Sequence, residues 1–270
     1  MHDSMKKYLH HKIFFKDENS DWVVFIHGAG GNMLSWKYQI EAFKPYFNLL
    51  LLDLRDHGES KNIEPTKENY DFQLVASDIL SLLDHLGIKK AHFITLSLGS
   101  VIVQKIEEMR PQIIDRLVMA GGVFKADVKI KAFVHSAKFL NYFLPYRWMY
   151  DIFSLLVLPR KNHQKARRIF RLQSQKLLPS EYLKWVELYK EFFVLLKSFF
   201  QREIQSLSLV IMGDEDHVFI KSARRFVERQ RNATMITLRK CGHICNIDQY
   251  EHFNNVVINF LQGQSVKITI

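Results

Sequence analysis

The chain has 270 residues, which allows one large α/β domain or two small ones. Its composition, 47% hydrophobic and 13% aromatic, excludes an intrinsically disordered, collagen-like or low-complexity protein. The formal net charge of +10 would suit nucleic acid or an anionic membrane, but the whole excess of positive charge lies between Val123 and Gln205.

Five short apolar runs, each followed by a polar or glycine-bearing turn, predict strands that are buried on both faces of a sheet. These runs are Trp22–Ile26, Leu49–Leu52, Ala91–Leu96, Leu117–Ala120 and Leu207–Met212. The segments between them have helical spacing, and the clearest, 72–86, ends before Gly87, a typical residue just beyond a helix. A further strand at Thr234–Leu238 lies between two predicted helices, 220–228 and 247–261. This alternation predicts an α/β fold with a mostly parallel, doubly wound sheet, whose ligands bind beyond the carboxyl ends of the strands.

Residues 123–205 interrupt the alternation of strand and helix. They contain no clear buried strand, show several helical patterns and include three prolines as helix breaks. We expect them to form an inserted helical cap, basic and rich in aromatic residues, on a core made of residues 1–122 and 206–270. The tail, 263–270, receives no functional assignment.

Targeting and redox signals are scarce in the sequence. No segment approaches the roughly 18 apolar residues of a membrane-spanning helix, and residues 1–15 lack the apolar stretch of a secretory signal. We therefore expect a cytoplasmic protein. Cys241 and Cys245 are too few for a disulfide scaffold and lack the partners of a recognisable zinc site, so we expect buried thiols and no metal.

A serine follows one predicted strand at the point where a helix begins. The segment Thr95–Ser100 links the strand Ala91–Leu96 to a helical pattern at 101–109, so a sharp turn would lift Ser97 out of the sheet. Such a turn usually reads Gly-x-Ser-x-Gly, because the helix packs closely against the strand. Thr95 stands at the first glycine, so this motif alone leaves a purely structural serine as an equal alternative.

Candidate acids and a candidate base occupy the turns after two later strands. They are Asp214, Glu215 and Asp216 after the strand at 207–212, and His243 after the last strand. Because the carboxyl ends of parallel strands meet at one edge of a sheet, Ser97, one of the acids and His243 can come together there. Each would be an ordinary capping or solvated residue alone, but their joint occurrence favours nucleophilic catalysis.

The chain resembles the α/β-hydrolase fold superfamily, in the branch with a helical cap inserted after the sixth strand. The resemblance covers nearly the whole chain and rests on His27–Gly31, Trp36, Asp53–Ser60, Leu86–Ile88, Gly213-x-x-Asp216 and Gly242–His243. It implies an eight-stranded type of sheet. The turn within Asp53–Ser60 has Asp56 where such proteins often have glycine, and we expect it to survive because aspartate tolerates the left-handed conformation better than most residues.

The resemblance also implies a role for each candidate side chain. It makes Ser97 the nucleophile, His243 the general base and then acid, and Asp216 the group that orients His243. Gly-x-x-Asp is the family spacing, so Asp216 is preferred, with Asp214 and Glu215 as rival acids.

The glycine-rich turn 27–31 is expected to stabilise an oxyanion. Two backbone N–H donors are needed for the tetrahedral intermediate, and the resemblance assigns them to Leu98, next to the nucleophile, and Ala29 in this turn. The alternative is that these glycines only allow a tight turn and have no catalytic role. The phosphate-loop and dinucleotide-binding motifs are absent from the sequence, so we expect no nucleotide and no cofactor.

The substrate prediction depends on the cap. Its aromatic residues, dense at 139–153, imply an apolar pocket for an acyl or aryl group, although they could instead pack the cap onto the core. Relatives that form an ester intermediate on aspartate are excluded by the serine at position 97. We therefore predict a carboxylesterase-like serine hydrolase that cleaves an ester, thioester or lactone with an apolar acyl or aryl group.

Two other functions stay open at this point. A carbon–carbon bond hydrolase of the same fold would use the same three residues on an acidic diketone, held by Arg147 or Arg160. The second open function is that of a noncatalytic protein which binds a ligand or associates with a membrane. The basic stretch Arg160–Arg171 could contact an anionic membrane surface weakly, recruit an anionic substrate, or simply be a solvated helix face. No nucleic-acid partner is expected, and the oligomeric state is left open.

Overall fold

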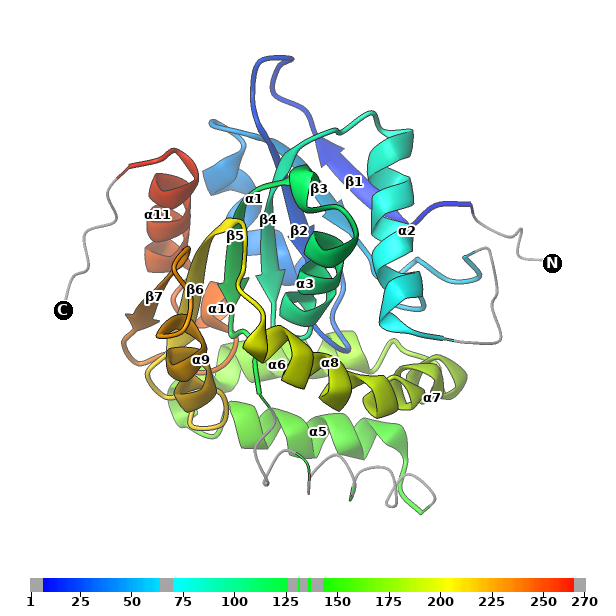
Figure 1. Cartoon of the computed structure of the whole chain (residues 1–270). Helices are drawn as coiled ribbons and strands as arrows, with labels where there is room; N and C mark the ends of the chain where they lie inside the picture. Colours follow the sequence, from blue (N-terminus) through cyan, green and yellow to red (C-terminus); the bar gives the residue numbers. More distant parts are fainter. Residues whose placement is uncertain (1–6, 64–69, 126–130, 132–135, 137–142, 265–270) are drawn as a thin grey trace.

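The computed structural model describes residues 7–63, 70–125, 131, 136 and 143–264, shown in Figure 1. Several segments discussed above lie partly outside these residues. The parts outside are 1–6 of the N-terminal segment, 126–130, 132–135 and 137–142 of the predicted cap, which include 139–142 of the aromatic cluster, and 265–270 of the tail.

Seven strands form one sheet in the order β1-β3-β2-β4-β5-β6-β7. Their bounds are β1 (His11–Phe14), β2 (Trp22–Ile26), β3 (Asn48–Leu52), β4 (Ala91–Leu96), β5 (Ile114–Ala120), β6 (Leu207–Gly213) and β7 (Ala233–Leu238). β1 pairs antiparallel with β3, and all other neighbours are parallel. The predicted α/β class and mostly parallel sheet are confirmed, and each of the six predicted strands is present.

The sheet differs from the eight-stranded type in one respect, since the described residues form seven strands. β1 is the edge strand, and the described residues before it, 7–10, form no strand. β1 is itself absent from the predicted strands. Two of its four residues, His11 and Lys12, have polar side chains, so β1 contains no continuous apolar run. All four residues are at least partly exposed.

Helices cover both faces of the sheet. Their bounds in the core are η1 (Met33–Trp36), α1 (Lys37–Phe43), α2 (Phe72–His85), α3 (Gly99–Met109), η2 (Pro111–Ile113), α9 (Ile220–Val227), α10 (Cys245–Asp248) and α11 (Tyr250–Leu261). α1 and α11 pack together on one face, and α2 and α3 on the other (Figure 1). This arrangement confirms a doubly wound sheet.

Local signals set the ends of these helices. The Asp71 carboxylate accepts a hydrogen bond from the Leu74 N–H at 2.6 Å and caps α2. Gly87 lies just beyond the end of α2 at a φ of 69°, as its position in the sequence predicts. The predicted helix 247–261 is instead two helices, because Gln249 leaves the helical conformation with φ −130° and ψ 50°.

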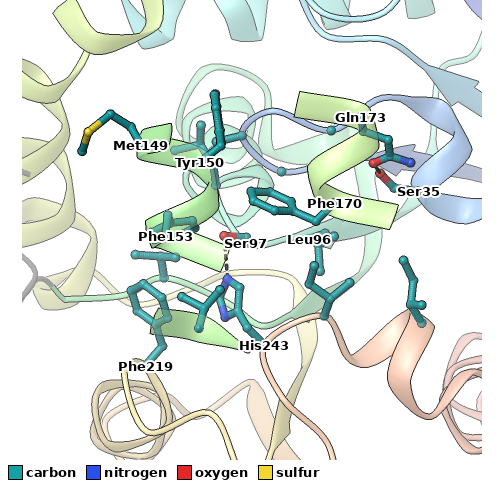
Figure 2. A pocket seen from close by; sticks show the side chains of 18 of the residues that line it. Ser35, Leu96, Ser97, Met149, Tyr150, Phe153, Phe170, Gln173, Phe219 and His243 are labelled. Carbon is teal, nitrogen blue, oxygen red and sulfur yellow. Dashed lines mark hydrogen bonds between the residues drawn. The ribbon is translucent and has the colours of Figure 1, made fainter. Parts of the chain in front are cut away.

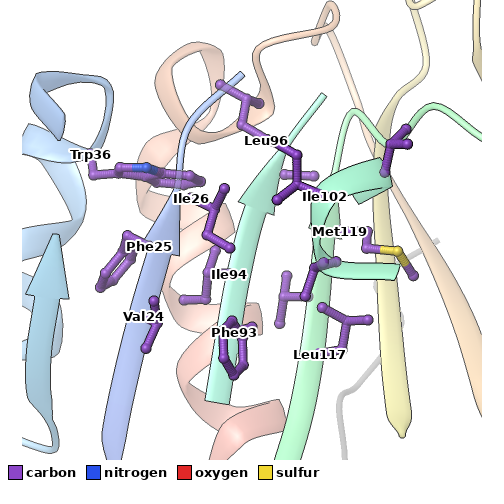
Figure 3. Close-up of a cluster of buried hydrophobic side chains, with 14 of the residues drawn as sticks. Val24, Phe25, Ile26, Trp36, Phe93, Ile94, Leu96, Ile102, Leu117 and Met119 are labelled. Atoms are coloured by element: carbon purple, nitrogen blue, oxygen red, sulfur yellow. The ribbon is translucent and has the colours of Figure 1, made fainter. Parts of the chain in front are cut away.

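The core lies on both faces of the central strands. Every residue of β4 is buried, and Phe93 and Ile94 point to opposite faces, as side chains of a strand must. Figure 3 draws both side chains together with Phe25 and Trp36, whose rings are 5.3 Å apart; Phe25 is in register with Ile94, so these two lie on the same face. Burial on both faces explains why the central strands appear in the sequence as unbroken apolar runs.

The described residues between β5 and β6 form helices and no strand. These helices are α5 (Tyr146–Val157), η3 (Lys161–His163), α6 (Gln164–Ser174), α7 (Pro179–Glu187) and α8 (Tyr189–Gln201), and we call them the cap helices. They lie beyond the carboxyl ends of the parallel strands, below the sheet in Figure 1. The exact division at 123–205 between core and cap stays a prediction.

Candidate active site

Ser97 occupies a tight turn between β4 and α3. Its φ is 51°, a left-handed conformation that serine rarely adopts, so the turn stores strain. Its N–H donates to the Ala120 carbonyl at 2.9 Å, which ties the turn to β5. A Cβ at Gly99 would lie 2.8 Å from the Ile26 carbonyl oxygen, so only glycine lets α3 pack this closely.

Thr95 fits at the position where the usual motif has glycine. Its side chain is buried, and its hydroxyl donates to the Val118 carbonyl on the neighbouring strand at 3.2 Å. The hydroxyl therefore has a partner, and the branched side chain lies toward β5 without opening the turn. Asp56 likewise keeps its turn, with a φ of 60°, as predicted for an aspartate in place of glycine.

The structure brings Ser97, His243 and Asp216 together. His243 Nε2 lies 2.8 Å from Ser97 Oγ (Figure 2), and His243 Nδ1 lies 2.7 Å from Asp216 Oδ2. The imidazole and the carboxylate are both buried. With Nδ1–H donating to the carboxylate, Nε2 is left to accept the hydroxyl proton, as a general base must.

The acid is held by its own loop. Asp216 Oδ1 accepts the N–H groups of Val218 at 3.2 Å and Phe219 at 3.0 Å, leaving Oδ2 for the imidazole. The Phe219 ring covers His243, with 4.8 Å between ring centroids. These contacts fix the direction of the carboxylate before any substrate arrives.

The two rival acids point elsewhere. Asp214 accepts the N–H of Cys241 at 3.2 Å. Glu215 contacts Arg160, the Asn162 side chain at 2.8 Å and His163 Nε2 at 2.7 Å. Both carboxylates are held by these other partners and neither hydrogen-bonds to His243, so the geometry favours Asp216 as the acid.

Two residues that line the cavity have backbone N–H groups without a hydrogen-bond partner among the described residues. Ala29 and Leu98 line the same cavity as Ser97, and within the described part of the chain neither N–H donates a hydrogen bond. They are therefore available to an oxyanion that forms at a carbonyl attacked by Ser97.

The turn that carries Ala29 is held by two buried histidines. Gly30 N–H donates to His57 Nε2 at 3.1 Å, and His57 Nδ1 donates to the Arg55 carbonyl at 3.0 Å. His27 Nδ1 donates to the Gly28 carbonyl at 2.8 Å. Sequence reasoning missed these roles, although His27 and His57 both lie within the motifs that carry the family resemblance.

Burial lowers the pKa of His57 to about 3, with the nearby His27 ring acting in the same direction. His57 is therefore neutral near pH 7, as it must be to accept the Gly30 N–H. An unfolded histidine titrates near 6.5, so between about pH 6.5 and about pH 3 the unfolded chain binds a proton that the folded chain does not. The free energy of unfolding must fall as the pH falls through this range.

We expect wild type to lose about 2 kcal/mol more stability between pH 7 and pH 5 than His57→Gln, whose amide oxygen can still accept the Gly30 N–H. Urea unfolding at the two pH values measures this difference. His252→Gln, which removes an exposed histidine, is the matched control and should keep the full wild-type loss. Equal losses in wild type and His57→Gln would contradict the assignment.

The cavity above Ser97 has a volume of about 130 Å³. Apolar side chains from four cap helices, α5 to α8, cover it, and Figure 2 shows Tyr150, Phe153 and Phe170 around the serine hydroxyl. Among the described lining residues none is charged. The polar groups away from the serine are chiefly Ser35 and Gln173, whose side chains hydrogen-bond to each other at 2.9 Å.

The two arginines considered for an acidic substrate lie outside this cavity. Arg160 contacts Glu215, and Arg147 lies against Tyr146 with its guanidinium 5.8 Å from the ring centroid. Neither lines the cavity. The described residues offer no cluster of side chains suited to a metal ion.

A family model of the alpha/beta hydrolase family matches residues 23–253. The chain belongs to this family. A protein of Haemophilus influenzae, provisionally named an esterase/lipase, is 23% identical over 257 residues, covering 90% of this chain and 84% of its own. Among solved structures, an enol-lactonase from Burkholderia xenovorans superposes with a TM-score of 0.79 at 20% identity, over 94% of this chain and 96% of its own.

A third similar protein is a meta-cleavage product hydrolase from Pseudomonas fluorescens, with a TM-score of 0.76 at 18% identity, over 96% of this chain and 98% of its own. At these identities, the two structures show the fold that this α/β hydrolase shares with them. Among its described helices, none has the length and hydropathy needed to cross a membrane.

Proposed function

We propose that this α/β hydrolase is a serine hydrolase that cleaves carboxylic esters, thioesters or lactones with a small, uncharged acyl or aryl group. The observation that carries the proposal is the hydrogen-bonded chain from Ser97 through His243 to Asp216, placed at the wall of an apolar cavity.

The proposed reaction passes through an acyl-enzyme. His243 Nε2 takes the proton of Ser97 Oγ as this oxygen bonds to the carbonyl carbon, and the carbonyl oxygen becomes an oxyanion facing Ala29 and Leu98 N–H. The imidazolium, stabilised by Asp216, then gives its proton to the leaving alkoxide or thiolate as that bond breaks. A water molecule repeats the sequence, releasing the carboxylic acid and restoring Ser97.

The size and charge of the cavity define the substrate class. A dry cavity of roughly 150 Å³ accommodates benzene, so about 130 Å³ suits a short acyl chain or one aromatic ring. A charged acyl group would be buried there without an ionic partner among the described lining residues, at a cost of several kcal/mol or more. We therefore propose uncharged substrates.

The names of similar proteins support ester or lactone cleavage: one is provisionally an esterase/lipase and another an enol-lactonase. The similarity to a meta-cleavage product hydrolase is the observation that favours the alternative function, carbon–carbon bond cleavage. An acidic diketone would need a cation in the cavity, and Arg147 and Arg160 both lie elsewhere. Thr95 and Asp56, the two departures from the family pattern that would favour a noncatalytic protein, both fit their turns, which supports the catalytic proposal.

A panel of p-nitrophenyl esters tests this substrate class. We expect kcat/KM to rise about fourfold per added methylene, up to roughly four to six acyl carbons, and to fall for longer chains that exceed the cavity. The hemisuccinate ester, close in size to the butyrate but negatively charged, should be at least about a hundredfold poorer. Indifference to chain length, or a preference for the hemisuccinate, would contradict the proposed pocket.

A further inference from the structure

The outer face of α5 is apolar. Trp148, Ile152, Leu155 and Leu156 recur at helical spacing, and their side chains are 58%, 43%, 56% and 41% exposed. The opposite face of the same helix lines the cavity above Ser97 through Met149, Tyr150, Phe153 and Val157. α5 therefore separates the candidate active site from solvent with apolar side chains on both sides.

α6 extends this outer face. Leu172 is 55% exposed, and two hydrogen bonds of 2.5 and 2.9 Å join Arg171 to Asp151 between the two helices. This ion pair lies at the surface, with Asp151 30% and Arg171 46% exposed, and its two residues adjoin Ile152 and Leu172 in the sequence. We therefore place the outer residues of both helices on one side of the molecule. We call the set Trp148, Ile152, Leu155, Leu156 and Leu172 the outer cap face; α5 lies at the bottom of Figure 1.

The charge around the outer cap face has one sign. Residues 146–176 contain eight lysines and arginines but a single acid, Asp151, which Arg171 already neutralises. Arg168 and Lys176 are exposed and have no ionic partner among the described residues. Arg168 lies one helical turn before Leu172, and Lys176 lies in the turn that follows the end of α6, so both are close in sequence to the exposed leucine.

We propose that the outer cap face binds an anionic lipid surface. Helices that lie in the membrane interface typically combine exposed tryptophan and branched aliphatic side chains with basic residues that have no ionic partner. The outer cap face has this composition. The apolar side chains would enter the boundary of the acyl chains, while Arg168 and Lys176 meet the anionic headgroups. The charge decides against a second copy of this chain as the occupant, because two such faces would repel each other.

Co-sedimentation of the full chain with vesicles tests this proposal without measuring catalysis. Phosphatidylcholine vesicles with about a third phosphatidylserine should bind the protein at low salt, and high salt or pure phosphatidylcholine should weaken binding strongly. The double variant Arg168→Gln/Lys176→Gln should lower the partition coefficient about thirtyfold. Lys12→Gln/Lys89→Gln removes the same charge from exposed lysines outside the cap helices and should bind like wild type.

The apolar part of the face has its own variant. Ile152→Ser/Leu155→Ser should lower the partition coefficient by at least about tenfold, whereas Phe15→Ser, at an exposed position after β1, should not. All four variants should keep wild-type circular dichroism, since every changed side chain is exposed. Binding that does not depend on the anionic lipid, or on either pair of cap residues, would overturn the proposal.

Light scattering at increasing protein concentration tests whether a second copy of the chain, rather than a lipid surface, covers the outer cap face. Dimers that disappear in Ile152→Ser/Leu155→Ser would mean that a second copy covers the outer cap face, and this too would overturn the proposal. Because vesicle binding needs no turnover, a failure here leaves the proposed hydrolase activity untouched, and a failure of that activity leaves the lipid surface untouched.

Discussion

Replacing Ser97 by alanine is expected to lower kcat on the best p-nitrophenyl ester by roughly 10⁴–10⁶-fold, and His243→Ala by a similar factor. Without the hydroxyl no acyl-enzyme can form, and without the imidazole the hydroxyl keeps its proton. The serine side chain is only partly buried, and among the described residues its hydroxyl hydrogen-bonds to His243 alone. The fold should therefore survive, with an unchanged thermal midpoint.

The matched control for this loss is Ser35→Ala. Ser35 lines the same cavity and its hydroxyl hydrogen-bonds to Gln173, but it lies away from the hydrogen-bonded chain of Ser97. We expect a change of less than about tenfold in kcat. If the Ser35 and Ser97 variants lost activity equally, the loss would belong to the cavity as a whole and not to one nucleophile.

Asp216→Asn is expected to lower kcat by about 10⁴-fold, with little change in KM. The asparagine oxygen can still accept the N–H groups of Val218 and Phe219, so the loop should keep its shape. The amide nitrogen would instead face His243 Nδ1, favour the wrong tautomer and remove the charge that stabilises the imidazolium. Steady-state kinetics near pH 7 measures the effect.

Asp214→Asn makes the same chemical change two residues earlier. Asp214 accepts only the Cys241 N–H among the described residues, and the asparagine can preserve this bond. Its activity should stay within about tenfold of wild type. A larger loss in Asp214→Asn than in Asp216→Asn would reassign the acid of the site.

Much of the fold could be predicted because its central strands are buried on both faces. Ala91–Leu96 and Trp22–Ile26 are unbroken apolar runs, and burial of this kind leaves a signal within the strand itself. The edge strand His11–Phe14 leaves none, since its side chains are half-buried or exposed. The break at Gln249 depends on local backbone geometry that hydrophobic spacing does not record.

The candidate site could be predicted as far as its residues follow strands. Ser97, Asp216 and His243 stand directly after three parallel strands, so topology alone brings them to one edge of the sheet. The fit of Thr95 depends on a hydrogen bond to a neighbouring strand, and His57, which accepts the Gly30 N–H, lies 27 residues from Gly30. Contacts of this kind are set by packing between distant segments and leave no local pattern.

The character of the pocket depends on which face each cap helix turns inward. Apolar side chains occur on both faces of α5, so its periodicity could not distinguish the lining residues Tyr150 and Phe153 from the exposed Trp148 and Leu155. The sequence also contained no sign that the described lining residues would carry no charge, an observation on which the proposed substrate class depends.

Covalent labelling with a fluorophosphonate tests the central claim, an activated serine at position 97, most directly. Intact-protein mass spectrometry should show one adduct on wild type, located on Ser97 by peptide mapping, no adduct on Ser97→Ala, and labelling at least about a thousandfold slower on His243→Ala. Equal labelling of wild type and Ser97→Ala, or no labelling of wild type by a probe small enough for the cavity, would contradict the account.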